Sequence, residues 1–390
     1  MVTLLLSCDD RVIHHQGKYY AASQDKLDFY QRYLRVFERV RLVCRCEEED
    51  LLKDSRIPLD TDSRIEYVPI PSFHGPIQYV KKFIGVGKAM GRAVDGCDAA
   101  VLRIPSTVAL RVGEIVKRKR IPYACEVVFD AYDEYCGEKG IHKLLWKKID
   151  KQMRSLCKDA EGISCVTANY LQQHYFSEKS DAFTSNYSSL SLPKSFFGSE
   201  KKYPTHKPFV IAHIANQVTF KGRKGHAQII DAVAFLQQRG VDVKVRFAGK
   251  DYFGDQKKLE EYARTNGVGE RIEYLGYLNR KGIEELLEKA DLYVMPTMAE
   301  GLPRVIIEAM AKGLPCITTP VSGNPELVDE HFLVPYYDTA MLADRIEELL
   351  SNSAVYENQS KENFTRSQQY EASLLEARRD KFYQELKKRC

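Results

Sequence analysis

The sequence lacks any apolar run that approaches the roughly 18 residues needed to cross a lipid bilayer. Its N-terminus, MVTLLLSCDD, is apolar for only a few residues, has no basic start and meets two acidic residues at once. These features are typical of a first β-strand and not of a signal peptide. We therefore expect a chain that is neither exported nor membrane-spanning.

The ten cysteines show neither metal-ligand spacing nor the spacing of a disulfide framework. Only Cys44 and Cys46 lie close together, and no CxxC pair or histidine partner completes a zinc pattern. Most of the others stand in apolar, strand-like stretches, where a free cysteine behaves as a small hydrophobic residue. We expect reduced thiols, a cytoplasmic location, and neither a metal nor a cofactor.

Charge of one sign is not in excess, because 58 Lys and Arg residues stand against 54 Asp and Glu residues, a net charge of +4. A nucleic-acid partner is therefore not indicated. The 390 residues are 44% hydrophobic and 29% charged, values typical of two globular domains. The stretch 185–208, rich in Ser, Pro, Lys and Asn, is the best linker. We expect domains at 1–195 and 196–365, followed by a C-terminal helix at 366–390.

One stretch, 290–318, predicts a β-loop-α-β unit. A short apolar run at 290–295 predicts a buried strand, and glycine and proline mark the following loop at 297–303. Apolar residues then recur at helical spacing over 304–312, where a glycine ends the helix. The next strand is 314–318. This unit is the repeat of a parallel, doubly wound α/β sheet.

Two carboxylates flank the start of the predicted helix, Glu300 in the loop and Glu308 about one turn inside the helix. Between them lie the free backbone N–H groups of the first turn, which carry a positive dipole potential and bind phosphates. Glu308 can accept hydrogen bonds from ribose hydroxyls, and Glu300 from hydroxyls on the far side. The arrangement suits a ligand with an anionic middle and hydroxyl-bearing ends, such as a sugar nucleotide.

These glutamates, separated by seven residues within EGLPRVIIEAMAKGLP, resemble the Glu-x7-Glu motif of retaining GT-B glycosyltransferases, in particular family 4. The segment 320–327, PVSGNPEL, looks like the GG-x-P-E segment of that family. The resemblance is specific over 208–350. It implies a GT-B fold, in which two Rossmann-like domains face each other across a cleft, and a last helix that crosses back to the first domain.

The resemblance also implies roles for single residues. Lys224, at a helix start, would neutralise the leaving diphosphate, and Arg223 or Lys221 would replace an arginine that the family carries earlier. Glu300 would hold the donor sugar and Glu308 the ribose. The expected catalytic residues are Lys224, Glu300, Arg223 and Asp130, and the expected donor-binding residues are Glu308, Gly301, Leu302, Pro303, Arg304, Gly17, Tyr277 and Leu278.

The stretch 8–17 is expected to be a loop after the first strand, followed by a helix through about Val40. In the resembling family, the glycine of this loop approaches the diphosphate, and Gly17 fits that place. His14 and His15 are candidates for the acceptor site, or they are ordinary loop residues.

Asp130 follows a strand predicted at 121–129, roughly where many members of the resembling family carry a histidine near the reacting sugar. With Asp133 and Glu134 it forms an acidic group that alternatively indicates a divalent metal. GT-B enzymes generally need none.

The stretch 139–158 holds seven Lys or Arg residues against one Asp, with apolar residues close to one helical face and the only tryptophan of the chain, Trp146. A basic amphipathic helix of this kind is typical of contact with an anionic membrane surface. Alternatively, the helix packs its apolar face on the sheet and exposes its lysines to water.

These features together predict a retaining, metal-independent glycosyltransferase. It would transfer a sugar from a nucleotide-sugar donor to a glycan or lipid-linked saccharide acceptor in cell-envelope polysaccharide biosynthesis. A UDP-sugar is the first choice of donor and a GDP-sugar the second. The alternatives are a nucleotide-sugar epimerase of similar fold, which would need paired histidines and carboxylates, and a non-catalytic scaffold.

Overall fold

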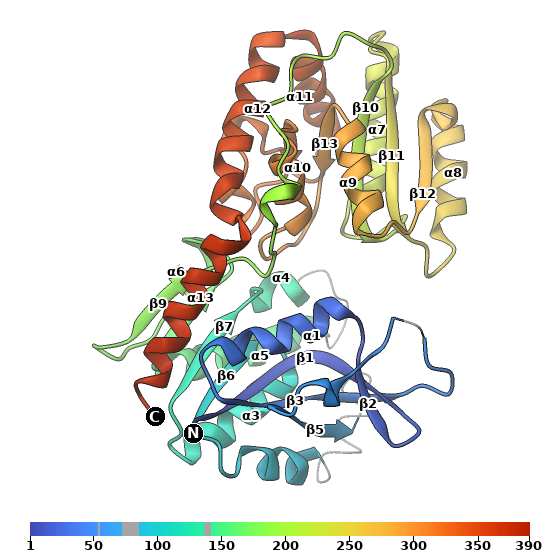
Figure 1. Cartoon of the computed structure of the whole chain (residues 1–390). Coiled ribbons are helices and arrows are strands. Elements are labelled where there is room, and N and C mark those ends of the chain that lie inside the picture. The colour runs from blue at the N-terminus through green and yellow to red at the C-terminus, as the bar shows by residue number, and fades with distance from the viewer. Residues whose placement is uncertain (54, 72–85, 136–141) are drawn as a thin grey trace. The chain divides into compact units, whose positions relative to one another are not determined.

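The computed structural model describes residues 1–53, 55–71, 86–135 and 142–390. They form two compact units (Figure 1). Unit 1 comprises Met1–Tyr132, Gly140–Tyr187 and Glu376–Cys390, and unit 2 comprises Asp133–Lys139 and Ser188–Leu375. Among the described residues, no helix is long and apolar enough to cross a membrane.

Unit 1 is built on a nine-stranded sheet. Its strands are β1 Thr3–His15, β2 Lys18–Ala21, β3 Arg39–Glu48, β4 Ile57–Pro58, β5 Ile65–Pro71, β6 Ala99–Ile104, β7 Tyr123–Val127, β8 Gly162–Cys165 and β9 Phe183–Asn186. Parallel to β1 lie β3 and then β5 on one side, and β6 to β9 on the other. The first strand is apolar and fully buried through Leu4, Leu5 and Leu6, because both faces of a parallel sheet are covered.

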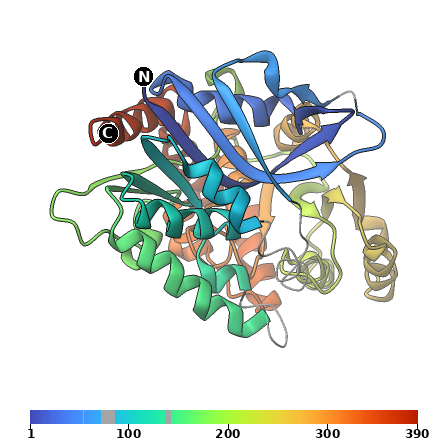
Figure 2. The same ribbon diagram turned by 90° about the horizontal axis from the view of Figure 1, so that it is seen from below.

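Helices lie on both faces of this sheet (Figure 2). They are α1 Gln24–Gln31, α3 Thr107–Arg118, α5 His142–Lys158, α6 Tyr170–His174 and, from Glu376, α13 Ala372–Lys387. The short helix α4 Ala131–Tyr135 is divided between the units after Tyr132. Successive residues of β7 mark the two faces, because side chains alternate along a strand. The Cys125 thiol forms a hydrogen bond with the Cys157 thiol of α5, whereas the Glu126 carboxylate accepts a hydrogen bond from Tyr383 of α13.

The prediction of a loop at 8–17 is wrong, because β1 continues to His15 and forms an antiparallel hairpin with β2. Residues 24–31 alone form an α-helix in the stretch predicted as helical through Val40. The acidic residues at this point are unusual in a strand, and for this reason the sequence pattern did not predict one. The strand forms because cross-strand ion pairs neutralise the charges, and a bulge after Ser7 shifts its register. Asp9 pairs with Arg45 at 2.8 Å, and Arg11 pairs with Glu47 at 2.7 Å.

Unit 2 is a five-stranded parallel sheet in the order β12-β11-β10-β13-β14. Its strands are β10 Phe209–Gln217, β11 Val243–Lys250, β12 Ile272–Gly276, β13 Leu292–Met295 and β14 Cys316–Thr318, and its helices are α7 His226–Gln238, α8 Asp255–Thr265, α9 Arg280–Lys289, α10 Arg304–Ala311, α11 Thr339–Ser351 and α12 Ser353–Ser367. The β-loop-α-β unit predicted at 290–318 is present as β13, α10 and β14. Figure 1 shows α8 along one edge of the unit and α12 at the other.

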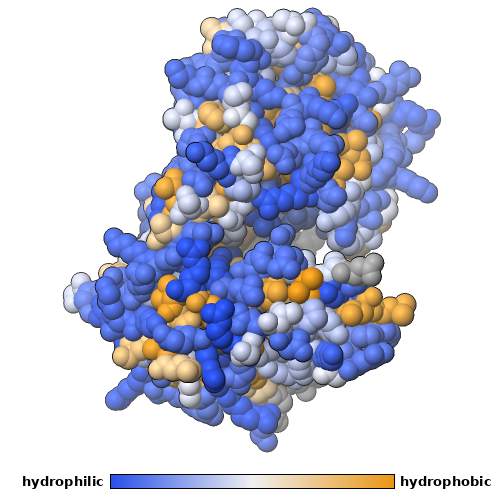
Figure 3. All heavy atoms as spheres, viewed as in Figure 1, coloured by the Kyte–Doolittle hydropathy of each residue, from blue (hydrophilic) through white to orange (hydrophobic). Residues whose placement is uncertain are grey.

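The surface view in Figure 3 is mostly hydrophilic on both units, with small hydrophobic patches. The apolar residues are instead inside each unit: Ile211, Val245 and Val294 of unit 2 are fully buried on neighbouring strands. Each unit therefore has a core of its own, which holds its loops in place.

Candidate functional site

Unit 2 reverses its strand order between β10 and β13. From β10 the chain first builds outward to β11 and β12, and then crosses to β13 and β14 on the other side. In such sheets, ligands bind outside the carboxyl ends of the strands at the point of reversal. The loops that begin there are 218–225 after β10 and 296–303 after β13, and they carry the predicted cations and Glu300.

The two loops are fastened to each other through main-chain atoms. The Arg223 carbonyl accepts hydrogen bonds from the Met298 amide at 2.9 Å and from Thr297 Oγ1 at 3.1 Å. Gly225 has a left-handed backbone (φ +75°), and a Cβ there would lie 1.9 Å from the Pro296 carbonyl oxygen. Only glycine therefore permits the close approach that places the side chain before it, Lys224, over the second loop.

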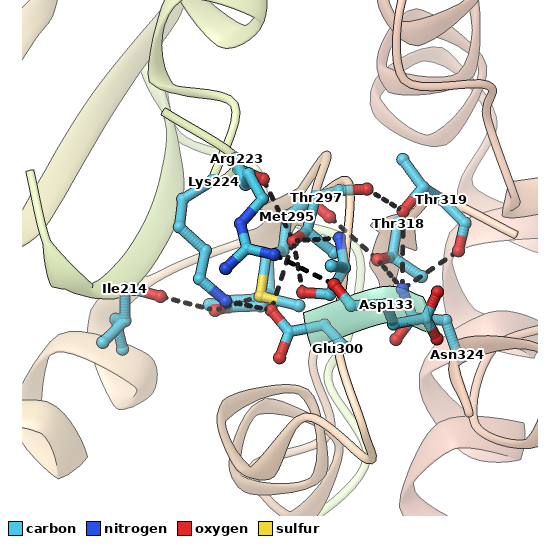
Figure 4. A network of polar contacts seen from close by, with 12 residues as sticks. Asp133, Ile214, Arg223, Lys224, Met295, Thr297, Glu300, Thr318, Thr319 and Asn324 are labelled. Atoms are coloured by element: carbon cyan, nitrogen blue, oxygen red, sulfur yellow. Dashed lines mark hydrogen bonds and ion pairs between the residues drawn. The ribbon is translucent and has the colours of Figure 1, made fainter. Parts of the chain in front are cut away.

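Lys224 Nζ forms an ion pair with Glu300 Oε1 (Figure 4). The two side chains are 32% and 13% exposed, so the pair is partly shielded from water but open to a ligand. Thr297 Oγ1 also lies 3.2 Å from Glu300 Oε1 and orients the carboxylate. The sequence predicted both residues for one site, and the structure brings them into contact across 76 positions of the chain.

Arg223 is held on the Asp133 main chain, because its Nη1 donates to the Asp133 carbonyl at 2.9 Å. The Asp133 carboxylate in turn accepts a hydrogen bond from Ser322, a buried residue with φ +47°. Figure 4 shows Asp133 beside Glu300 in this network. Lys221 is exposed, so Arg223 is the better placed of the two cations proposed to replace the family's arginine.

Helix α10 begins with amide groups that have no partner inside the helix. Its first helical hydrogen bond runs from the Ile307 amide to the Pro303 carbonyl at 3.4 Å. Pro303 contributes no capping side-chain bond, and no acidic residue lies in the first turn. Gly301, Leu302 and Pro303 are buried. The positive end of the helix dipole is therefore left for an anion.

Glu308 lies one turn inside α10 and is half-buried. Among the described residues, no hydrogen bond to its carboxylate is formed. Burial raises its pKa to about 7, against the opposing effects of Arg304 and Arg280. A desolvated carboxylate without donors has a high affinity for hydroxyl groups that can donate to it, because each such bond relieves the cost of burial.

Three positioning residues of this site, Thr318, Thr319 and Asn324, were not predicted from the sequence. Thr318 Oγ1 donates to the Met295 carbonyl at 2.8 Å, and Thr319 Oγ1 donates to the Thr297 carbonyl at 2.6 Å. Asn324 Nδ2 then donates to Thr318 Oγ1 at 2.9 Å and to the Thr319 carbonyl at 3.0 Å. The only sequence signal for them was the PVSGNPEL segment, which contains Asn324.

The remaining donor-binding candidates of unit 2 lie just beyond β12. Tyr277 is 67% exposed, and Leu278 is half-buried. Both follow Gly276, which has φ +65° and open space around its missing side chain.

Four candidates belong to unit 1, where their roles toward a ligand stay predictions. Gly17 (φ +80°) lies in the turn of the β1–β2 hairpin, and not in the loop that was expected to carry it. His14 Nδ1 lies 2.8 Å from Glu48, and His15 Nδ1 lies 2.7 Å from the Glu49 carbonyl. Asp130 is buried after β7 and accepts hydrogen bonds from the Tyr132 amide at 2.7 Å and the Tyr175 hydroxyl at 3.1 Å.

No metal-binding group of three His, Cys, Asp or Glu residues occurs within the described part of the chain. In the acidic group of Asp130, Asp133 and Glu134, which alternatively indicated a divalent metal, the Glu134 side chain lies outside the described part. The nine described cysteines form no disulfide with one another.

The basic stretch 139–158 is helical as α5 from His142, and 139–141 lie outside the described residues. Ile149, Met153 and Leu156 of this helix are buried, whereas Lys147, Lys148 and Lys151 are exposed. The apolar face is therefore part of the core of unit 1, as the second of the two interpretations predicted. The lysine face remains open.

Residues 201–366 match the family model "Glycosyl transferases group 1". The chain is 24% identical to Protein CapJ of Staphylococcus aureus over 380 residues, 97% of this chain and 94% of that one. It is 26% identical to the amylovoran biosynthesis glycosyltransferase AmsK of Erwinia amylovora over 168 residues, 40% of each chain.

The fold is similar to that of Anabaena HepE in complex with UDP-glucose, with a TM-score of 0.66 and 17% sequence identity, covering 97% of this chain and 98% of that one. Similarity over both units confirms the predicted α/β fold with two Rossmann-like halves. The chain has the GT-B fold, and its residues 201–366 are similar to the glycosyl transferases group 1.

Proposed function

We propose that this protein is a retaining, metal-independent glycosyltransferase that transfers a sugar from a nucleotide sugar to a saccharide acceptor. The observation that carries the proposal is the Lys224–Glu300 pair at the open end of α10. The Glu308 carboxylate, to which no described residue donates a hydrogen bond, lies one turn further on. Glu300 is thus in the place for the sugar, Lys224 and the free amides of α10 for the diphosphate, and Glu308 for the ribose.

In the reaction, the bond between the anomeric carbon and the diphosphate oxygen breaks, and its electron pair stays on the diphosphate. Lys224, Arg223 and the first amides of α10 stabilise this charge, which is electrostatic catalysis by fixed groups. The acceptor oxygen forms the new bond on the same face of the sugar and passes its proton to the departing phosphate oxygen. When the donor binds, the Lys224–Glu300 ion pair opens. Lys224 then pairs with the phosphate, and Glu300 accepts hydrogen bonds from the donor sugar.

UDP-sugars are the first donor class to test and GDP-sugars the second. The similar fold of HepE, solved with UDP-glucose, supports the first choice. The acceptor we propose is a glycan or lipid-linked saccharide of the cell envelope, since AmsK is named for amylovoran biosynthesis.

The test is the rate of donor hydrolysis and transfer for K224A and E308A, with K257A on the exposed face of α8 as control. Loss of one charge-assisted contact to the diphosphate is expected to lower kcat by about 10²–10³ in K224A, because the leaving group is then less stabilised. E308A is expected to raise KM. Unchanged kinetics in both variants, at unchanged melting temperatures, would refute these roles.

We further propose that unit 1 meets an anionic membrane surface on the cytoplasmic side through the exposed face of α5. Lys147, Lys148 and Lys151 lie on this face, and attraction to anionic lipid is worth about 1 kcal/mol per lysine. The triple change to glutamate is expected to abolish sedimentation with vesicles that contain phosphatidylglycerol. Vesicles of phosphatidylcholine alone are the control, and equal sedimentation with both kinds contradicts the proposal.

A further inference from the structure

A pocket of about 460 Å³ lies on unit 1, and its lining carries a surplus of positive charge. The residues that line it are Lys88, Gly91, Arg92, Asp95 and Lys119. Three of them are basic and one is acidic, and all four charged residues are exposed. A positive concave surface concentrates anions, because its low-dielectric walls focus the field. The pocket takes no part in the proposed transfer reaction.

The pocket lies at the amino edge of the unit 1 sheet. Residues 86–94 are helical and lead through Asp95 to β6. Lys119 is the C-cap residue of α3, which leads to β7. Ligands of parallel sheets bind at the opposite edge, outside the carboxyl ends of the strands, where Asp130 follows β7. The pocket is therefore separate from the expected acceptor site of this unit.

The positive charges of the pocket are only partly neutralised. Lys119 forms an ion pair with Asp95, the single acidic residue of the lining. Among the described residues, Lys88 and Arg92 form no ion pair, and they lie four positions apart on one helix face, where like charges repel. The helix dipole favours a cation only in the last turn, so it accounts for Arg92 but not for Lys88. An anion in the pocket would remove this repulsion.

The frame of the pocket is fixed, and one of its residues leaves room for a ligand. Arg41 Nη1 donates hydrogen bonds to the Ala93 carbonyl at 3.1 Å and to the Asp95 carbonyl, and so holds the end of the helix. Gly91 lies inside the helix, where a Cβ would meet none of the described atoms within 4 Å apart from the helix's own backbone. Glycine is a poor helix former, and packing does not require it at this position. What it provides is space in the pocket.

We propose that this pocket binds a phosphate ester, with Arg92 as the two-pronged partner of the phosphate and Lys88 as the second cation. A guanidinium matches two phosphate oxygens at once, and an ammonium adds a point charge. The volume of about 460 Å³ exceeds what a phosphate alone needs, since a water molecule takes up about 30 Å³. The ester therefore carries an organic group. A phospholipid headgroup and a soluble phosphorylated metabolite share this chemistry.

The experiment measures binding to the full chain by calorimetry. Glycerol 3-phosphate is the soluble probe, and dihexanoyl phosphatidylglycerol, below its micelle concentration, is the lipid probe. The variants are K88M, R92M and G91L, the last of which fills the pocket. R118M is the matched control, because Arg118 is an exposed cation next to Lys119 that does not line the pocket. K224A tests whether the donor site of unit 2 takes the probes instead, and melting temperatures verify that every variant folds.

At least one probe is expected to bind the wild type, and the probe with the higher affinity identifies the source of the phosphate. K88M and R92M are expected to bind it at least about tenfold more weakly, and G91L not measurably, whereas R118M and K224A bind it like the wild type. The inference is overturned if neither probe binds, if R118M weakens binding as much as R92M does, or if only K224A abolishes it.

Discussion

Two glutamates, one in each unit, show how the same side chain is used in opposite ways. Glu126 of unit 1 is 2% exposed and accepts hydrogen bonds from Arg103 at 2.9 Å, Tyr33 at 3.1 Å and Tyr187 at 2.9 Å, besides contacts with Arg32 and Tyr383. Glu308 of unit 2 is only half-buried, and no hydrogen bond to its carboxylate is formed among the described residues.

The pKa values of the two carboxyls differ accordingly. Burial alone would raise the pKa of Glu126, but Arg32, Arg103 and the tyrosine hydroxyls lower it to about 2. For Glu308 burial dominates and raises the pKa to about 7. A buried carboxylate whose donors all come from the protein stabilises the fold, whereas one left without donors is available to a ligand.

The largest effect is expected when the donors of Glu126 lose their acceptor. E126A leaves Arg32 and Arg103 as unpaired charges inside unit 1, and the free energy of unfolding of this unit is expected to fall by about 3–5 kcal/mol. Urea titration followed by tryptophan fluorescence measures it, because Trp146, the only tryptophan, lies in unit 1. A loss below about 1 kcal/mol would show that Glu126 is not needed for stability.

The opposite pattern is expected for E308Q. Removal of the carboxylate weakens donor binding by about 10- to 100-fold, equivalent to roughly 1.5–3 kcal/mol for hydrogen bonds to a charged group. The free energy of unfolding of unit 2, followed by circular dichroism because this unit contains no tryptophan, stays within about 0.5 kcal/mol of the wild type. Calorimetry with UDP measures the first quantity, and a large loss of stability without loss of affinity would remove the contrast with Glu126.

A smaller effect is expected from pH alone. If only ionised Glu308 binds the ribose, donor affinity rises up to about tenfold between pH 6 and 8, and binding at pH 7 releases about half a proton per molecule. E308Q is the control and gives a flat profile. An equally steep profile in this variant would assign the titration to another group.

The contributions of the two carboxyls to the free energy of unfolding depend on pH in opposite directions. The raised pKa of Glu308 favours the protonated form in the fold, so its contribution to stability is lost as the pH rises from 4.5, the ordinary pKa of a glutamate, through about 7. The contribution of Glu126 is present above about 4.5 and is lost as the pH falls toward 2.

Sequence patterns predicted unit 2 better than unit 1. Its strands and helices follow hydrophobic periodicity and glycine or proline stops, as at 290–318, and these signals are local. In unit 1 the strand signal of β1 was hidden at Asp9 and Asp10, because acidic residues rarely stand in strands. Asp9 pairs with Arg45 on a neighbouring strand 36 positions away, and Asp10 pairs with Lys26. No local pattern contains these partners.

The sequence by itself determined the chemistry of the site: a lysine before a helix start, two glutamates around another helix start, and free amides between them. Local spacing decides these features, because a helix places its own first turn and the residues beside it. Only the tertiary structure decided that Lys224 meets Glu300 and that none of the described residues donates to Glu308. Those facts depend on strand order and on main-chain contacts such as that of Gly225 with Pro296, which join segments far apart in the chain.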